Sequence, residues 1–145
     1  MILLDTDHVT VLQRRSEPAA TVLRTRLQHV PAEEVGTTIV TVQEQLRGWS
    51  AVIHRATRPE QEVFAYQQLH TVLMYFAAMP VALFDHAAAA RVAQLRAARV
   101  RVGAMDLKIA AIALVHDALL LSRNVSHFAR IPTLRVEDWT RPVEL

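Results

Sequence analysis

The N-terminal residues 1–7 of this 145-residue chain, MILLDTD, indicate its fold class. Its leading residues form an unbroken apolar run, which is typical of a short strand that is buried on both faces of a sheet. Such strands occur almost only in parallel sheets that helices cover on both sides. The run ends at Asp5, so this stretch predicts an α/β protein with a carboxylate directly after its first strand.

The rest of the chain alternates predicted helices with predicted strands. The further strands are expected at residues 34–40, 81–84, 119–122 and 134–136. The helices are expected at residues 6–15, 18–28, 41–49, 58–78, 85–100 and 106–116. This alternation implies a three-layer sandwich in which helices flank a small parallel sheet. Because the chain shows no internal repeat or linker, we expect residues 1–145 to form one domain.

Composition excludes several classes of protein. Hydrophobic residues make up 52% of the chain and charged residues 21%, which suits a packed core and argues against disorder. With no cysteine present, disulfides, cysteine-ligated zinc, iron–sulfur clusters and a thiol nucleophile are excluded. The longest mostly apolar run, residues 72–84, is shorter than the roughly 20 residues that cross a bilayer. Since residues 1–7 carry acids where a secretory signal needs apolar residues, we expect a cytoplasmic protein without a membrane partner.

The charge balance leaves a nucleic-acid partner open. Sixteen basic and 14 acidic residues give a formal net charge of +2. Lys108 is the single lysine, so nearly all of the basic residues are arginines. Arginine binds phosphate in a bidentate manner, but an arginine-rich composition does not by itself establish phosphate binding.

Three acids lie where the predicted topology would bring them to one edge of the sheet. Asp5 follows the first strand, Glu44 lies in the first turn of the predicted 41–49 helix, and Asp106 opens the 106–116 helix. In a parallel α/β fold, the carboxyl ends of the strands and the N-termini of the crossover helices face the same edge, where functional groups collect. We therefore expect the three carboxylates to lie near one another.

Each of these acids also has a purely structural explanation. Asp5 and Asp106 occupy positions that suit helix caps or acids in a first helical turn. Glu44 would complete a capping box with Thr41. Three carboxylates at one edge would repel one another, and a divalent cation would relieve that repulsion. Hard oxygen ligands favour Mg²⁺ or Mn²⁺, and such an ion activates water for attack on a phosphodiester.

Four segments resemble the PIN-domain family, and more narrowly the VapC-type toxins of type II toxin–antitoxin systems. They are MILLDTDHVTVLQ at residues 1–13, TTIVTVQEQLRGW at 37–49, VGAMDLKIAAIAL at 102–114 and LLLSRNVSHFARIPTLRVEDW at 119–139. In order and spacing, the resemblance covers the chain from residue 1 to about residue 139. It implies a small parallel sheet between helices and Mg²⁺- or Mn²⁺-dependent cleavage of RNA by a metal-activated water.

The resemblance also implies roles for individual residues. Three acids would be both catalytic residues and metal ligands: Asp5, Glu44 and Asp106. Thr6 would orient the site through its hydroxyl. The family's fourth acidic position falls in residues 122–128, where this chain has Asn124 and Ser126 and no acid. These two would act through hydrogen bonds or water, and the missing acid argues against a second metal ion.

Other polar residues were assigned by their place in the predicted topology. Four basic residues are candidates for binding RNA phosphates: Arg99, Arg101, Lys108 and Arg123. We interpret Asp7 as a helix-capping or surface acid, because a strand-to-helix turn would direct it away from Asp5. The seven histidines form no i, i+4 pair, and we interpret all of them as structural or surface residues.

The toxin resemblance implies two protein partners besides the RNA substrate. One is a small cognate antitoxin, and the other is a second copy of the chain in a homodimer. An antitoxin segment would occupy a groove beside the first two predicted helices, at residues 6–15 and 18–28.

Two alternatives to a metal-dependent ribonuclease toxin stay open. A catalytically inactive PIN-like binding module would account for the missing fourth acid. A haloacid-dehalogenase-like phosphatase would use Asp5 as its nucleophile and Asp7 as its acid, because residues 5–9 match D-x-D-x-[TV] after an apolar strand. That family also needs a late acidic pair, which the residues after the fourth predicted strand do not supply.

Overall fold

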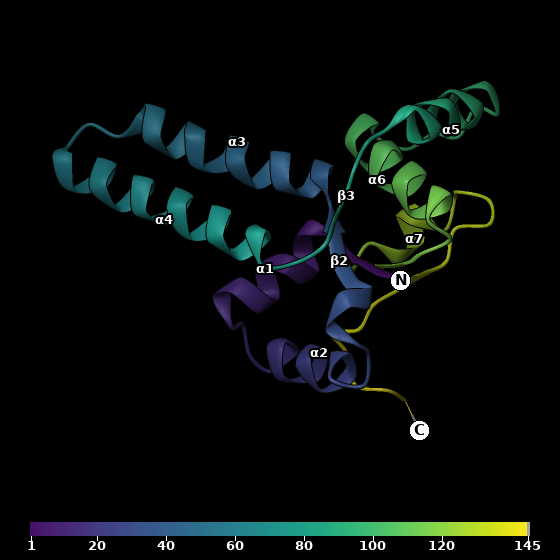
Figure 1. Cartoon of the computed structure of the whole chain (residues 1–145), viewed down its shortest axis with the longest axis horizontal. Coiled ribbons are helices and arrows are strands. Elements are labelled where there is room, and N and C mark those ends of the chain that lie inside the picture. Colours follow the sequence, from purple (N-terminus) through teal and green to yellow (C-terminus); the bar gives the residue numbers. More distant parts are fainter. Residues whose placement is uncertain (145) are drawn as a thin grey trace.

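Five parallel strands form the sheet of the computed structural model, which describes residues 1–144 (Figure 1). They are β1 (Ile2–Leu4), β2 (Val35–Thr38), β3 (Val81–Ala82), β4 (Leu119–Leu121) and β5 (Val136–Glu137). Their order across the sheet is β3-β2-β1-β4-β5, and every neighbouring pair is parallel. The predicted α/β fold with a small parallel sheet is confirmed.

Helices connect the strands throughout the described residues. They are α1 (Thr6–Arg14), α2 (Ala19–Leu27), the 3-10 helix η1 (Ala32–Glu34), α3 (Ile39–Arg55), α4 (Pro59–Ala77), α5 (His86–Ala97), α6 (Ala104–Val115) and α7 (Val125–Phe128). Between residues 1 and 144, none of these helices has both the length and the apolar character that crossing a membrane requires.

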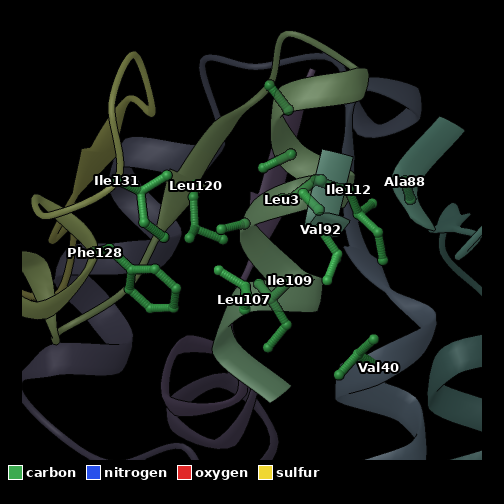
Figure 2. Packing of buried hydrophobic residues seen from close by; sticks show 14 of the residues in the cluster. Leu3, Val40, Ala88, Val92, Leu107, Ile109, Ile112, Leu120, Phe128 and Ile131 are labelled. Carbon is green, nitrogen blue, oxygen red and sulfur yellow. The ribbon is translucent and has the colours of Figure 1, made fainter. Parts of the chain in front are cut away.

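Alternating side chains along β1 divide the core into two halves. Leu3 belongs to a cluster formed with α5, α6 and α7, which includes Ile112 and Phe128 (Figure 2). Ile2 and Leu4 belong to a second cluster, formed with α1, α2 and α4 on the opposite face. Because β1 is buried on both faces, its residues are all apolar, and the predicted three-layer sandwich is confirmed.

The junction between β2 and α3 differs from the prediction. β2 ends at Thr38, whose side chain accepts a hydrogen bond from the backbone N–H of Thr41 at 3.2 Å. Thr38 therefore caps the helix, and the predicted capping box of Thr41 with Glu44 is wrong. Glu44 lies in the second turn of α3 rather than the first. The β-branched residue Val40 is buried in the core as part of this helix, so tertiary packing overrides its preference for a strand.

Further boundaries also differ from those predicted. Helix α3 continues to Arg55 rather than ending at Trp49, and it packs along α4 to form a hairpin that projects from the sheet (Figure 1). Helix α6 begins at Ala104, so Asp106 lies within its first turn. The short helix α7 was not predicted.

Candidate active site

The reversal of strand order puts a topological switch point at the carboxyl ends of β1 and β4. The chain moves from β1 to β2 and β3 on one side, and β4 then lies on the other side of β1. The backbone N–H of Asp5 donates to the carbonyl of Leu121 at 2.9 Å, which joins the two strand ends. In open parallel sheets, ligands bind at such a switch point. Asp5 and Ser122, the residues that follow these strands, lie at this position.

Asp5 is a buried carboxylate with two hydrogen bonds. Its Oδ1 accepts from the backbone N–H of Thr6 at 2.7 Å, and its Oδ2 accepts from the hydroxyl of Ser122 at 2.8 Å. The side chain of Asp5 also caps the N-terminus of α1, so its predicted role as a helix cap is confirmed. Burial and the negative charge of Asp7 raise the pKa of Asp5 to about 6, against the opposing effect of the two hydrogen bonds. A buried acid with a raised pKa at a switch point of a parallel sheet indicates a candidate functional site.

Glu44 reaches the same site through Thr6. The hydroxyl of Thr6 donates to Oε2 of Glu44 at 2.6 Å, while the backbone N–H of Thr6 donates to Asp5. One residue at the start of α1 therefore holds acids from the β1 end and from α3. The structure thus brings Asp5 and Glu44 together, as the strand-end argument predicts, and joins them through Thr6, which the family resemblance names.

Asp106 approaches from the first turn of α6. Its negative charge contributes to the raised pKa of Asp5, so the two carboxylates lie within electrostatic reach. Its Oδ2 is 3.1 Å from Nε2 of His127, a residue of α7. The carboxylate is half-exposed. His127 was interpreted as structural or surface, and the structure instead places it beside a candidate metal ligand.

Asp7 is turned toward Asp5, and the prediction that it points away is wrong. Its Oδ2 lies 3.2 Å from the hydroxyl of Ser122 and accepts from the backbone N–H of Arg123 at 2.9 Å. Its Oδ1 is 2.6 Å from Nδ1 of His8. Burial opposes the shift, but the hydrogen bonds from His8 and Arg123 hold the pKa of Asp7 below its usual range. Asp7 therefore stays ionised beside Asp5.

Among the described residues that follow β4, Ser122 contacts the acids of the site, whereas the predicted residues Asn124 and Ser126 do not. The Ser122 hydroxyl is fully buried and accepts from the backbone N–H of Asn124 at 3.1 Å. The side chains of Asn124 and Ser126 are exposed and make no hydrogen bond to the acids within residues 1–144. Their water-mediated role stays a prediction.

The four predicted phosphate ligands differ in their surroundings. Arg99 and Arg101 are exposed in the connection between α5 and α6. The ammonium group of Lys108 lies 5.9 Å from the centre of the Phe84 ring, in a cation–π contact. Arg123 donates from Nε to the hydroxyl of Thr140 at 3.2 Å. In the described part of the chain, Arg99 and Arg101 therefore lack the side-chain contacts that Lys108 and Arg123 make.

The carboxylates of Asp5, Glu44 and Asp106 supply the hard oxygen donors that Mg²⁺ and Mn²⁺ prefer. None of the salt bridges within residues 1–144 joins Asp5, Glu44 or Asp106 to a lysine or an arginine. Over the same residues, no group of three or more His, Asp or Glu side chains is arranged to hold a metal ion by itself. Mg²⁺ commonly keeps several waters and binds through one or two carboxylates. This donor set therefore suits Mg²⁺ or Mn²⁺ held partly through water.

Comparison with protein families decides the classification. The PIN domain family model matches residues 2–134. The chain belongs to the PIN-domain family. This confirms the resemblance seen in the sequence and decides against the haloacid-dehalogenase-like alternative. A comparison with curated proteins gives no match.

Solved structures similar to this PIN domain include VapBC assemblies. VapBC-1 from nontypeable Haemophilus influenzae has a TM-score of 0.73 at 22% identity, covering 97% of this chain and 100% of that chain. DNA-bound VapBC from Salmonella typhimurium has a TM-score of 0.73 at 26% identity, covering 95% and 97%. A toxin–antitoxin complex from Klebsiella pneumoniae has a TM-score of 0.68 at 22% identity, covering 96% and 98%. The predicted similarity to VapC-type PIN domains is confirmed over nearly the whole chain.

Some site residues of this PIN domain were missed in the sequence. Ser122 directly follows β4, so the strand-end rule would have selected it if the strand had been predicted to end one residue earlier, at Leu121. His8 and His127 carry no such signal, because their partners are set by the packing of segments that are distant in sequence.

Proposed function

We propose that this PIN domain is a metal-dependent ribonuclease toxin that hydrolyses RNA phosphodiesters and is inhibited by a small cognate antitoxin. One observation carries the proposal: Asp5 is buried at the β1–β4 switch point, and burial together with the negative charge of Asp7 raises its pKa. A divalent cation at this point supplies the missing positive charge. Membership of the PIN family and similarity to VapBC assemblies support the same assignment.

The chain's residues have distinct tasks in this proposal. Asp5, Glu44 and Asp106 would hold a Mg²⁺ or Mn²⁺ ion, directly or through water. When bound, the ion lowers the pKa of a coordinated water and polarises a phosphoryl oxygen. Thr6 orients Glu44 with its hydroxyl while its backbone N–H orients Asp5. We assign Asn124 and Ser126 to water-mediated contacts at the N-terminus of α7.

RNA would approach over the loop that precedes α6. Arg99 and Arg101 are exposed there and lead toward Asp106, so we assign them to RNA phosphates. Lys108 and Arg123 belong to the same proposed set. We place them second, because each side chain already has a partner within the protein.

We predict that Asp106→Asn lowers the rate of metal-dependent RNA cleavage by about 100-fold or more, since it removes a charge that holds the ion. The substitution keeps the size of the side chain in the first turn of α6. Cleavage of single-stranded and structured RNA is measured with Mg²⁺, with Mn²⁺ and with EDTA. Asp117→Asn is the matched control, because Asp117 is an exposed acid just beyond the other end of α6.

The control should cleave RNA at the wild-type rate. Equal cleavage by wild type and Asp106→Asn would reject this site. If wild type binds Mn²⁺ tightly and cleaves no RNA in any of these assays, the result favours the catalytically inactive binding module.

A groove between α1, α3 and α4 is the place we propose for the antitoxin. It has a volume of about 430 Å³, and its lining includes Gln13, Gly48, Trp49, Val72 and Tyr75. The sequence predicted a groove beside α1 and α2. Helix α1 does line the groove, but α2 does not, because its Leu23 is fully buried in the core. An apolar floor with glutamine amides at its rim suits an amphipathic helical segment.

We predict that Thr71→Arg abolishes protection by the antitoxin without changing RNA cleavage. Thr71 lines the groove, and a long charged side chain there would fill it. The measurement is growth after co-expression with the small protein encoded by the neighbouring gene. His70→Arg, an exposed change on the opposite side of the same helix and outside the groove lining, should leave protection intact. Protection of both variants would contradict the groove assignment.

We also retain a homodimer and a cytoplasmic location as parts of the proposal. Large apolar side chains of α4 are exposed, among them Val63, Tyr66 and Met74. An exposed apolar face of this kind is typical of an association surface. Light scattering of the purified chain measures the oligomeric state.

A further inference from the structure

The C-terminal segment of the described chain is bonded to the candidate site through a buried histidine. Asp138 and Trp139 follow β5, and the backbone N–H of Trp139 donates to Nε2 of His8 at 3.1 Å. The guanidinium of Arg26 lies 4.6 Å from the centre of the Trp139 ring, in a cation–π contact that fixes this segment. His8 has no exposed surface.

These contacts fix the tautomer of His8. Because Trp139 donates an N–H to Nε2, that nitrogen is an acceptor and carries no hydrogen. The neutral ring therefore carries its hydrogen on Nδ1, which is 2.6 Å from Oδ1 of Asp7 and donates to it. The nearby carboxylate of Asp138, 3.6 Å from Nε2, accepts instead from the backbone and hydroxyl of Thr140.

Asp7 connects His8 to the end of β4. Its other oxygen accepts from the backbone N–H of Arg123 and contacts the hydroxyl of Ser122. The same hydroxyl donates to Oδ2 of Asp5 at 2.8 Å. A continuous series of hydrogen bonds therefore runs from Trp139 through His8 and Asp7 to the β4 end that holds Asp5.

We propose that His8 is a positioning residue of the nuclease site: its Nδ1–H, held in place by the Trp139 backbone, fixes Asp7 against the end of β4 and so holds Ser122 and the Asp5 carboxylate in place for the cation. The inference rests on the proposed metal-dependent cleavage. Hydrogen-bonded partners of metal ligands typically affect metal affinity or activity by about 10- to 100-fold.

Two amide substitutions separate the two ring nitrogens. His8→Asn places a donor near the position of Nδ1 and offers nothing to Trp139. His8→Gln places an acceptor near Nε2 and removes the donor to Asp7. Both are polar and smaller than or similar in size to histidine, and thermal unfolding checks that both fold. The measured quantities are kcat, KM and the Mn²⁺ dissociation constant.

We expect His8→Gln to lower kcat and weaken Mn²⁺ binding by about 10- to 100-fold, with KM changed by less than about threefold. We expect His8→Asn, which keeps a donor to Asp7 but loses the bond to Trp139, to lose less kcat and less Mn²⁺ affinity than His8→Gln. If both variants lose activity in proportion to their loss of stability, His8 is only structural and the inference is overturned. Wild-type behaviour of His8→Gln would overturn it as well.

A second readout keeps this inference distinct from the proposed function. If wild type binds Mn²⁺ but cleaves no RNA, the proposed function fails, and the Mn²⁺ affinities of the two variants still decide the role of His8. Long-range ¹H–¹⁵N NMR spectra report the tautomer of His8 directly. We expect a protonated Nδ1 and an unprotonated Nε2, and a hydrogen on Nε2 would overturn the inference whatever the cleavage result.

Discussion

Replacing Asp5 by Asn should abolish RNA cleavage and, at the same time, stabilise the metal-free fold. The loss of activity should be about 1,000-fold or more, because the substitution removes a carboxylate that would bind the ion. Asn is as good a helix cap as Asp, so α1 keeps its N-terminus. The Ser122 hydroxyl can accept from the new amide and donate to Asp7. The variant therefore keeps the local hydrogen bonds without a buried charge beside Asp7.

The gain in stability should depend on pH in a defined direction. Burial and the charge of Asp7 raise the pKa of Asp5 to about 6, whereas the unfolded chain titrates near its ordinary value of roughly 3.9. The contribution of Asp5 to folding is therefore most favourable below about pH 4. It is lost progressively as the pH rises to about 6, and is constant above that value. Asp5→Asn should exceed wild type by about 1–3 kcal/mol at pH 7.5, and the difference should shrink toward pH 4.

Urea unfolding in EDTA at several pH values measures this difference. Adding Mn²⁺ should reduce the difference in unfolding free energy between the variant and wild type, because the ion stabilises the folded wild type and not the folded variant. A variant that is less stable than wild type at pH 7.5 would show that the Asp5 charge is compensated by a group of the protein, and would contradict the electrostatic account of the site.

Gly36→Ala should destabilise the protein by about 3 kcal/mol, through a mechanism unrelated to the site. A β-carbon at Gly36 would lie 2.4 Å from the backbone oxygen of Pro80 and 3.1 Å from its carbonyl carbon. That oxygen also accepts from the backbone N–H of Thr37 at 3.1 Å, so β3 would have to move away from β2. Because backbone cannot yield as a flexible side chain does, the cost should be large.

Gly48→Ala is the matched control for Gly36→Ala. Gly48 lies in the interior of α3, and a β-carbon there meets nothing within 4 Å. Helix propensity predicts a gain of about 0.5–1 kcal/mol. Denaturant unfolding of both variants measures the two effects. Similar stability changes of the two variants would contradict the close approach of Gly36 to Pro80.

The fold could be predicted because its deciding signals are local. The run before Asp5 is apolar on both faces, and the alternation of strands and helices leaves few topologies for a parallel sheet. The boundary between β2 and α3 could not be predicted in the same way. Thr38 and Thr41 are both suited to cap a helix, and the β-branched residues between them favour a strand. The burial of Val40 against α6 and β1 decides in favour of the helix.

The candidate site was predictable in part for a similar reason. The strand-end rule selected Asp5, Glu44 and Asp106. The structure joins Asp5 to Glu44 through Thr6 and places Asp106 within electrostatic reach of Asp5, while the roles of these acids stay predictions. The rule could not show that Thr6 joins two of these acids or that Asp7 turns toward Ser122. Those contacts depend on the relative placement of α1, α3 and β4, which no short stretch of sequence encodes.

Anomalous diffraction from crystals grown with Mn²⁺ would locate the cation on which the proposed cleavage depends. We expect a Mn²⁺ ion with carboxylate oxygens of Asp5 and Asp106 among its ligands and with waters completing its coordination. Glu44 should lie in that shell or be joined to it by a water. A crystal that contains Mn²⁺ at a concentration sufficient for RNA cleavage, but shows no manganese between these acids, would contradict the account.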